Sequence, residues 1–170
     1  MEVLSSAIEP EFRRAGWVPE RRVQVSTNVP RDHRAFDVLQ SFGGLKVGET
    51  GRGEECAKSD VEFYETDMPD QLVEAWQTIL KCRFVGIGEC HHGHGQLWLD
   101  ETGRLFNSGL AGMPKVSLEG TTFAEGMERL LRGFRSKPML LPWQTQVTVW
   151  GEVFRAGDVG VLSAESFVVS

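Results

Sequence analysis

The stretch FVGIGECHHGHGQLWLDETGRLFN (residues 84–107) decides the fold that we expect for this chain. Three short apolar runs within it, FVGIGE, QLWLDE and RLFN, are separated by HHGHG and by TG. Glycine adopts the positive φ that tight hairpins require, so both separators are typical of turns. Residues 84–107 are therefore predicted to form a three-stranded antiparallel meander.

Segments with helical periodicity flank this meander on both sides. Apolar residues recur at intervals of three and four in residues 7–15, 30–42, 68–80 and 122–133. Capping preferences predict where these helices start, at Ser6, Pro30, Asp67 and Thr122. Gly43 and Gly44 are expected to end the second helix.

Alternation with period two predicts further strands in RRVQVS (residues 21–26) and VEFYET (residues 61–66). Residues 48–59 between them are expected to form a loop. The runs QVTVW, DVGVL and SFVVS make the last third of the chain β-rich. We predict one α+β domain with a mainly antiparallel sheet covered by about four helices. Residues 1–136 would form its main part, and residues 137–170 a β-rich extension packed on it.

The composition is that of an ordinary globular chain, with 170 residues, 41% hydrophobic and 25% charged. No stretch approaches the ~20 apolar residues of a membrane span, and the N-terminus lacks a signal-peptide pattern, so no membrane partner is expected. Three cysteines are too few and odd in number for a disulfide framework, which indicates the reducing cytoplasm. The net charge of −6 argues against direct binding of nucleic acid.

The densest group of metal-ligand side chains is the run CHHGH from Cys90 to His94. Thiolate and imidazole are the usual zinc ligands, so Cys90, His92 and His94 form a candidate metal set. Adjacent strand residues point to opposite faces, however, and the only other histidine, His33, lies on a distant predicted helix. We therefore expect no metal or other cofactor, and interpret His91, His92 and His94 as an exposed hairpin tip. A metal-dependent enzyme using this cluster is the alternative function.

No motif for nucleophilic catalysis is present in the sequence. The GxSxG elbow is missing, and Cys56 lies among acidic neighbours that raise the pKa of a thiol and lower its reactivity. The carboxylate pairs Glu54-Glu55 and Asp100-Glu101 are typical of solvated turns. We therefore predict no catalytic residues.

Residues 49–74 are strongly acidic, with nine acids and two bases. Two interpretations stay open, a solvated face and a patch that steers a basic partner. Under the second interpretation the binding residues are Glu54, Glu55, Asp60, Glu62 and Glu65, with Trp98 as an aromatic anchor. Trp98 is assigned to a partly exposed face because its neighbours Leu97 and Leu99 form the better core pair.

Five motifs, taken in order, carry a resemblance to a known family. They are AGWVPER (residues 15–21), FGGL (42–45), GIGE (86–89), GQLWLDETGRLF (95–106) and TTFAEGMERLL (121–131). Together they resemble the SUKH superfamily, in particular its third family of bacterial immunity proteins, over roughly residues 12–133. The resemblance implies a single α+β domain that binds and neutralises a cognate polymorphic toxin, such as a nuclease or deaminase, by sequestration without catalysis. The motif residues themselves are architectural and do not mark a toxin-binding site.

Overall fold

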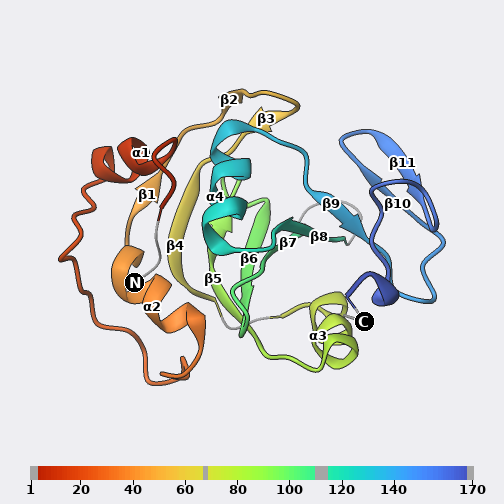
Figure 1. Cartoon of the computed structure of the whole chain (residues 1–170), viewed down its shortest axis with the longest axis horizontal. Helices are drawn as coiled ribbons and strands as arrows, with labels where there is room; N and C mark the ends of the chain where they lie inside the picture. Colours follow the sequence, from red (N-terminus) through yellow and green to blue (C-terminus); the bar gives the residue numbers. More distant parts are fainter. Residues whose placement is uncertain (1–3, 67–68, 110–114, 168–170) are drawn as a thin grey trace.

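A seven-stranded antiparallel sheet forms the centre of the computed structural model, which describes residues 4–66, 69–109 and 115–167 (Figure 1). The strand order is β1-β4-β5-β6-β7-β8-β9. These strands are β1 (Lys46–Val47), β4 (Val61–Thr66), β5 (Phe84–Cys90), β6 (Gly95–Asp100), β7 (Leu105–Gly109), β8 (Val116–Gly120) and β9 (Lys137–Met139). The predicted meander over residues 84–107 is confirmed, because β5, β6 and β7 are consecutive neighbours in the sheet.

Four α-helices and two small hairpins complete the described structure. The helices are α1 (Glu9–Arg14), α2 (Arg34–Phe42), α3 (Gln71–Leu80) and α4 (Phe123–Arg132), with a short 3-10 helix η1 (Ala164–Phe167). The hairpins are β2 (Gly51–Arg52) with β3 (Ala57–Lys58), and β10 (Gln146–Val149) with β11 (Glu152–Arg155). The predicted single-domain α+β class is confirmed. None of the described helices has the length and apolar character needed to cross a membrane.

The starts of α2 and α3 differ from the prediction. Nδ1 of His33 accepts a 3.1 Å hydrogen bond from the backbone N–H of Ala35, so α2 begins at Arg34 rather than at Pro30. Asp70 caps α3 by accepting from the N–H of Val73 at 2.8 Å. The predicted cap of α3, at residue 67, lies outside the described residues. In both helices the start is defined by a capping side chain, His33 or Asp70, that lies two or three residues before the first buried residue of the helix.

The predicted start is wrong for α1 and correct for α4. Ser6 does not cap α1, whose N-cap position is held by Ile8 without a side-chain hydrogen bond. Thr122 caps α4 as predicted, since its hydroxyl accepts from the N–H of Glu125 at 3.2 Å. The Glu125 carboxylate accepts in return from the N–H of Thr121 at 2.8 Å, so the cap extends one residue further than the expected capping box.

Both faces of the sheet are covered, and this corrects the assignment of Trp98. Leu97 and Leu99 face the core formed with α1, α2 and α4, as predicted. Trp98 faces a second core, formed with α3, where Trp76 is also buried. The prediction that Trp98 is partly exposed is wrong: the residue is 2% exposed, and its Nε1 donates a 2.9 Å hydrogen bond to the hydroxyl of Ser108.

The strand predicted over residues 21–26 is wrong, and the expected loop over residues 48–59 contains the short β2–β3 hairpin. Residues 21–26 pair with no described strand. They instead contact the end of α2, where the N–H of Val23 donates to the carbonyl of Gln40 at 2.9 Å. The Arg21 guanidinium donates to the carbonyl of Gly43 at 2.8 Å. These contacts take the place of a neighbouring strand.

The C-terminal third adds a strand to the sheet and part of the second core. The prediction for QVTVW is confirmed by β10, whereas DVGVL forms no strand and makes only a bridge between Leu162 and Met139. The strand predicted for SFVVS is wrong in its described part, because Ser166 and Phe167 belong to η1. Residues 168–170 lie outside the described residues. The Phe167 ring contacts the ring of Trp76 at a centroid distance of 5.9 Å. The extension thus helps to bury the face on which Trp98 lies.

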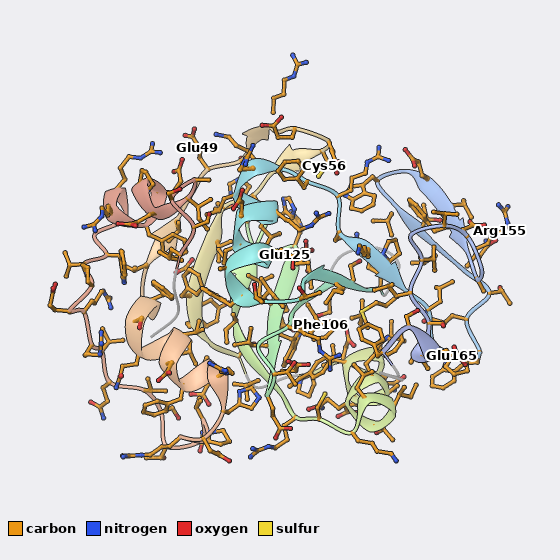
Figure 2. The ribbon with its side chains drawn as sticks, in the orientation of Figure 1. Glu49, Cys56, Phe106, Glu125, Arg155 and Glu165 are labelled. Carbon is orange, nitrogen blue, oxygen red and sulfur yellow. The ribbon has the colours of Figure 1, made fainter. Side chains whose placement is uncertain are left out.

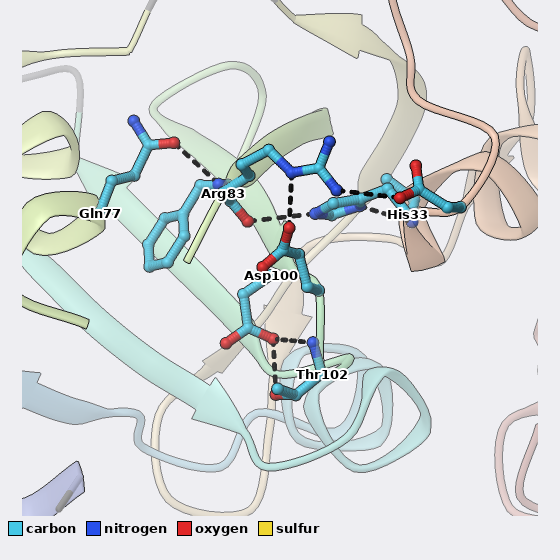
Figure 3. A network of polar contacts seen from close by, with 9 residues as sticks. His33, Gln77, Arg83, Asp100 and Thr102 are labelled. Carbon is cyan, nitrogen blue, oxygen red and sulfur yellow. Dashed lines mark hydrogen bonds and ion pairs between the residues drawn. The ribbon is translucent and has the colours of Figure 1, made fainter. Parts of the chain in front are cut away.

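A polar network joins α2, α3 and the β6–β7 turn (Figure 3). Nε2 of His33 lies 3.1 Å from the carbonyl oxygen of Arg83, and since Nδ1 of this histidine is an acceptor, Nε2 carries the proton. The buried Asp100 accepts from the hydroxyl of Thr102 at 2.8 Å and from Nε of Arg104 at 2.6 Å. The motif residues Asp100 and Arg104 are therefore architectural, as the resemblance implied.

Candidate partner-binding end

Loops and turns from separate parts of the chain meet at one end of the sheet, here called the loop-rich end. It comprises residues 49–60, 91–94, 132–136 and 150–151. Figure 1 shows the β2–β3 hairpin beside the end of α4, and Figure 2 shows Glu49 and Cys56 at this same end. The N–H of Glu54 donates to the carbonyl of Arg132 at 2.9 Å, and the Thr50 hydroxyl lies 3.1 Å from Nε2 of His92. Loops held in this way on a rigid sheet are common positions for binding residues.

Three predicted binding residues, Glu54, Glu55 and Asp60, lie at the loop-rich end. Glu54 forms an ion pair with Arg132 at 3.3 Å. The carboxylate of Glu55 accepts from the N–H of Arg135 at 2.9 Å. Asp60 lies 3.1 Å from Nδ1 of His92. Each acid thus has a partner within the chain, and for Glu54 this partner is the permanently charged guanidinium of Arg132.

The other three predicted binding residues lie elsewhere. Glu62, on β4, forms an ion pair with Lys46 at 2.9 Å on the sheet. Glu65 lies further along the same strand, beside a depression that also contacts Val23. Trp98 is in the second core. The structure therefore brings together only half of the predicted set.

The histidine turn is strained and is held by Asp60. His91 and His92 have φ values of 51° and 54°, in the left-handed region that residues other than glycine rarely adopt. Asp60 accepts from the backbone N–H of His92 at 3.1 Å through Oδ1, and from that of His91 at 3.2 Å through its carbonyl oxygen. His92 and His94 are exposed as predicted. His91 is half-buried, and burial lowers its pKa, so its assignment to the exposed tip is wrong.

The candidate metal set Cys90, His92 and His94 is not brought together. Cys90 is buried in the first core, and burial raises the pKa of its thiol. His92 and His94 are exposed on the turn that follows. Among the residues that the structure describes, no group of three or more His, Cys, Asp or Glu is arranged to hold a metal ion.

A polar cavity of about 50 Å³ lies beneath the loop-rich end and was not predicted. Glu119, on β8, lines it and is 3% exposed. Oε1 of Glu119 accepts a 3.1 Å hydrogen bond from Nδ2 of Asn107, and burial raises the pKa of this carboxyl to about 7. The signal in the sequence was an acid inside the apolar run VSLEG, where a carboxylate is expected to be buried with the strand.

Further polar residues line the cavity without being fully paired. Among the described residues, Ser117 Oγ and Asn107 Oδ1 are buried and have no hydrogen-bond partner. Burial lowers the pKa of Lys115 and raises that of Cys56. The predicted rise for Cys56 is confirmed, but burial is its main cause and the acids contribute less.

The comparison with known families agrees with this architecture. A model of the SUKH-3 immunity protein family matches residues 4–133. The match extends through all four helices and ends at Gly133, the C-cap of α4. Comparisons with curated proteins and with solved structures gave no match. Because the family model spans well over half of the chain, this protein belongs to the SUKH-3 immunity protein family.

Proposed function

We propose that the protein binds a cognate bacterial toxin domain at the loop-rich end and neutralises it by sequestration, without catalysis. Family membership supports the immunity function. One observation carries the choice of surface. Of the four non-glycine residues with positive φ in the described structure, His91, His92 and Trp150 lie at this end. Such strain costs of order 1–3 kcal/mol per residue and collects at binding and active sites.

The exposed acids favour a toxin with a basic surface. The side chains of Glu54 and Asp60 are 55% and 30% exposed, and both are held by basic groups of the chain itself. A toxin arginine or lysine can replace these groups without leaving a carboxylate unpaired. Nucleases and deaminases need basic grooves to attract phosphate, so we infer a toxin of one of these kinds. Neutralisation would then take place in the cytoplasm of the producing bacterium.

We assign the extension, residues 137–170, a part in partner choice. Specific protein interfaces bury about 1,600 Å² in total, more than a few carboxylates provide. Trp143 and Val153 of the extension are 66% and 43% exposed, and both lie outside the family match. Exposed aromatic residues are common interface anchors.

Replacing Glu54, Glu55 and Asp60 with lysine tests the acidic surface. Steering acts over roughly 8 Å at physiological salt, so the association rate with the cognate toxin should fall first, most strongly at low salt. Protection of cells that express this toxin should fall in parallel. Circular dichroism and urea unfolding should show a folded protein. This check is necessary because Glu54 contacts Arg132 at the end of α4, Glu55 contacts Arg135 beyond it, and Asp60 holds the histidine turn.

The matched control replaces Glu20, Glu74 and Glu165 with lysine. These three acids are exposed and lie away from the loop-rich end, and replacing them changes the net charge by the same amount as the first variant does. An effect of overall charge would slow both variants equally, whereas a local binding surface predicts a slower rate only in the first. If the first variant associates and protects like the wild type, the loop-rich end is solvated surface and the proposed surface is wrong.

A further inference from the structure

The cavity beneath the loop-rich end contains a carboxylate that forms no ion pair with any residue that the structure describes. Glu119 is 3% exposed and accepts one described hydrogen bond, from the uncharged amide of Asn107. The nearby cations are Arg129 and Lys115, of which Lys115 also lines the cavity, and neither forms an ion pair with Glu119 in the described structure. The guanidinium of Arg129 donates to the carbonyl of Arg135 instead. A buried carboxylate in this position gains stability from any cation that reaches it.

The other walls of the cavity suit a positively charged group. Ser117 is 2% exposed, and its Oγ has no partner among the described residues. The aromatic residues Phe134 and Trp150 also line the cavity, and guanidinium groups of the chain already lie near these rings, Arg132 at 5.1 Å from the Phe134 centroid and Arg135 at 5.4 Å from the Trp150 centroid. Acceptor oxygens beside aromatic rings form a site for an ammonium or guanidinium group, which supplies several N–H donors and is attracted to a ring face.

Backbone strain supports a binding role for the same cavity. His91 and Trp150 have φ values of 51° and 53°, and both line it. Trp150 occupies the first position of the two-residue turn between β10 and β11, where asparagine or glycine is favoured. A bulky ring at such a position is held there at a cost to stability. Backbone strain of this kind collects at binding sites, and Trp150 lines the cavity, so the strain indicates a binding role for this residue.

We propose that this cavity receives a lysine or arginine side chain of the toxin, with Glu119 as the ion-pair partner at its floor. The inference rests on the proposed function, because it names the toxin group that the loop-rich end would bind. The volume of about 50 Å³ equals a few water positions of roughly 10–15 Å³ each, enough for one ammonium or guanidinium head group. The family match supplies Glu119 and Ser117, and the extension supplies Trp150, so both parts of the chain form the site.

The first experiment uses the protein alone, titrated with methylguanidinium chloride and followed by NMR. Saturable shifts are expected for His91, Ser117 and the indole of Trp150, and they should be lost in Glu119→Gln. Sodium chloride at matched ionic strength is the control for screening. Absence of saturable shifts means that the cavity holds only water, and overturns the proposal whatever the toxin does.

The second experiment measures toxin affinity at pH 8. Glu119→Gln keeps the size of the side chain and removes its charge, so affinity should fall by about 30-fold or more. The control Glu74→Gln, on the exposed face of α3, should bind like the wild type. Wild-type affinity for Glu119→Gln overturns the proposal even if methylguanidinium binds. Failure of the wild-type protein itself to bind the toxin is a separate result, which rejects the proposed function while the NMR titration still tests the cavity.

Discussion

Glu119 on β8 and Asn107 on the neighbouring strand β7 are joined through their side chains, with Oε1 of the glutamate accepting a 3.1 Å hydrogen bond from Nδ2 of the asparagine. Burial raises the pKa of this carboxyl from 4.5 to about 7. A carboxyl with a raised pKa in the folded state binds its proton more tightly there than in the unfolded chain. The stability that Glu119 contributes should therefore be lost as pH rises from about 4.5 to about 7.

Glu119→Gln removes this dependence. The variant should match the wild type near pH 4.5 and become more stable above it, by on the order of 3 kcal/mol at pH 8, because each pKa unit corresponds to about 1.36 kcal/mol. Urea unfolding between pH 4.5 and 8 measures the difference. Glu125→Gln is the control of opposite sign: the Thr121 hydrogen bond lowers the pKa of Glu125, so this variant should be less stable than the wild type at pH 7 and recover as pH falls. Parallel curves for Glu119→Gln and wild type would contradict the prediction.

Trp98 and Trp143 form a matched pair for the second prediction. Trp98 is 2% exposed and Trp143 is 66% exposed. Trp98→Ala should lower the free energy of unfolding by about 3–5 kcal/mol, because it opens a cavity in the second core and leaves the Ser108 hydroxyl without its donor. Trp143→Ala should change it by no more than about 0.5 kcal/mol. Equal effects in a denaturant titration would show that Trp98 does not hold the core together.

Replacing His91, His92 and His94 together with alanine should shift the free energy of unfolding by no more than about 1 kcal/mol. Alanine and histidine are both strained at positive φ, so the backbone term changes little, and the contacts of His92 with Asp60 are at the surface. Thermal unfolding with and without zinc measures the effect. Stoichiometric zinc that stabilises the wild type but not the variant would instead support the metal site.

Trp150→Asn separates stability from binding. Asparagine is the favoured residue at the first position of a two-residue turn followed by glycine, and Gly151 already occupies the second with φ 77°. The relief of strain should largely offset the lost aromatic contacts, for a net change of no more than about 1 kcal/mol. Toxin affinity should nevertheless fall, because the cavity loses an aromatic wall. A variant that binds as tightly as the wild type would leave the strained tryptophan without a role.

Local patterns in the sequence were enough to predict the sheet meander, the end of α2 at Gly43 and the start of α4 after Thr122. They failed where distant parts of the chain meet. Trp98 was judged by its neighbours Leu97 and Leu99, and nothing local shows that α3 and the extension cover its face of the sheet. Residues 21–26 alternate like a strand, but their backbone hydrogen-bonds to the end of α2, through Val23 and Gln40, and not to a neighbouring strand.

The candidate site was predictable only in its exposed parts. Glu54, Glu55 and Asp60 belong to a loop whose acidity is visible in the sequence. Their hydrogen-bond and ion-pair partners come from the other half of the chain, so these pairings were not visible in the sequence. Glu119 was hidden in an apolar run, and its significance depends on Asn107 from the neighbouring strand.

Strand β6 is buried along both of its faces, and this has a consequence for how the protein can change over evolutionary time. A slip of one residue in its pairing would exchange Trp98 with Leu97 or Leu99 and disrupt two cores at once. The register is therefore fixed independently of the turns at its ends. Insertions and substitutions in residues 91–94 can alter the surface of the loop-rich end while the sheet beneath keeps its pairing.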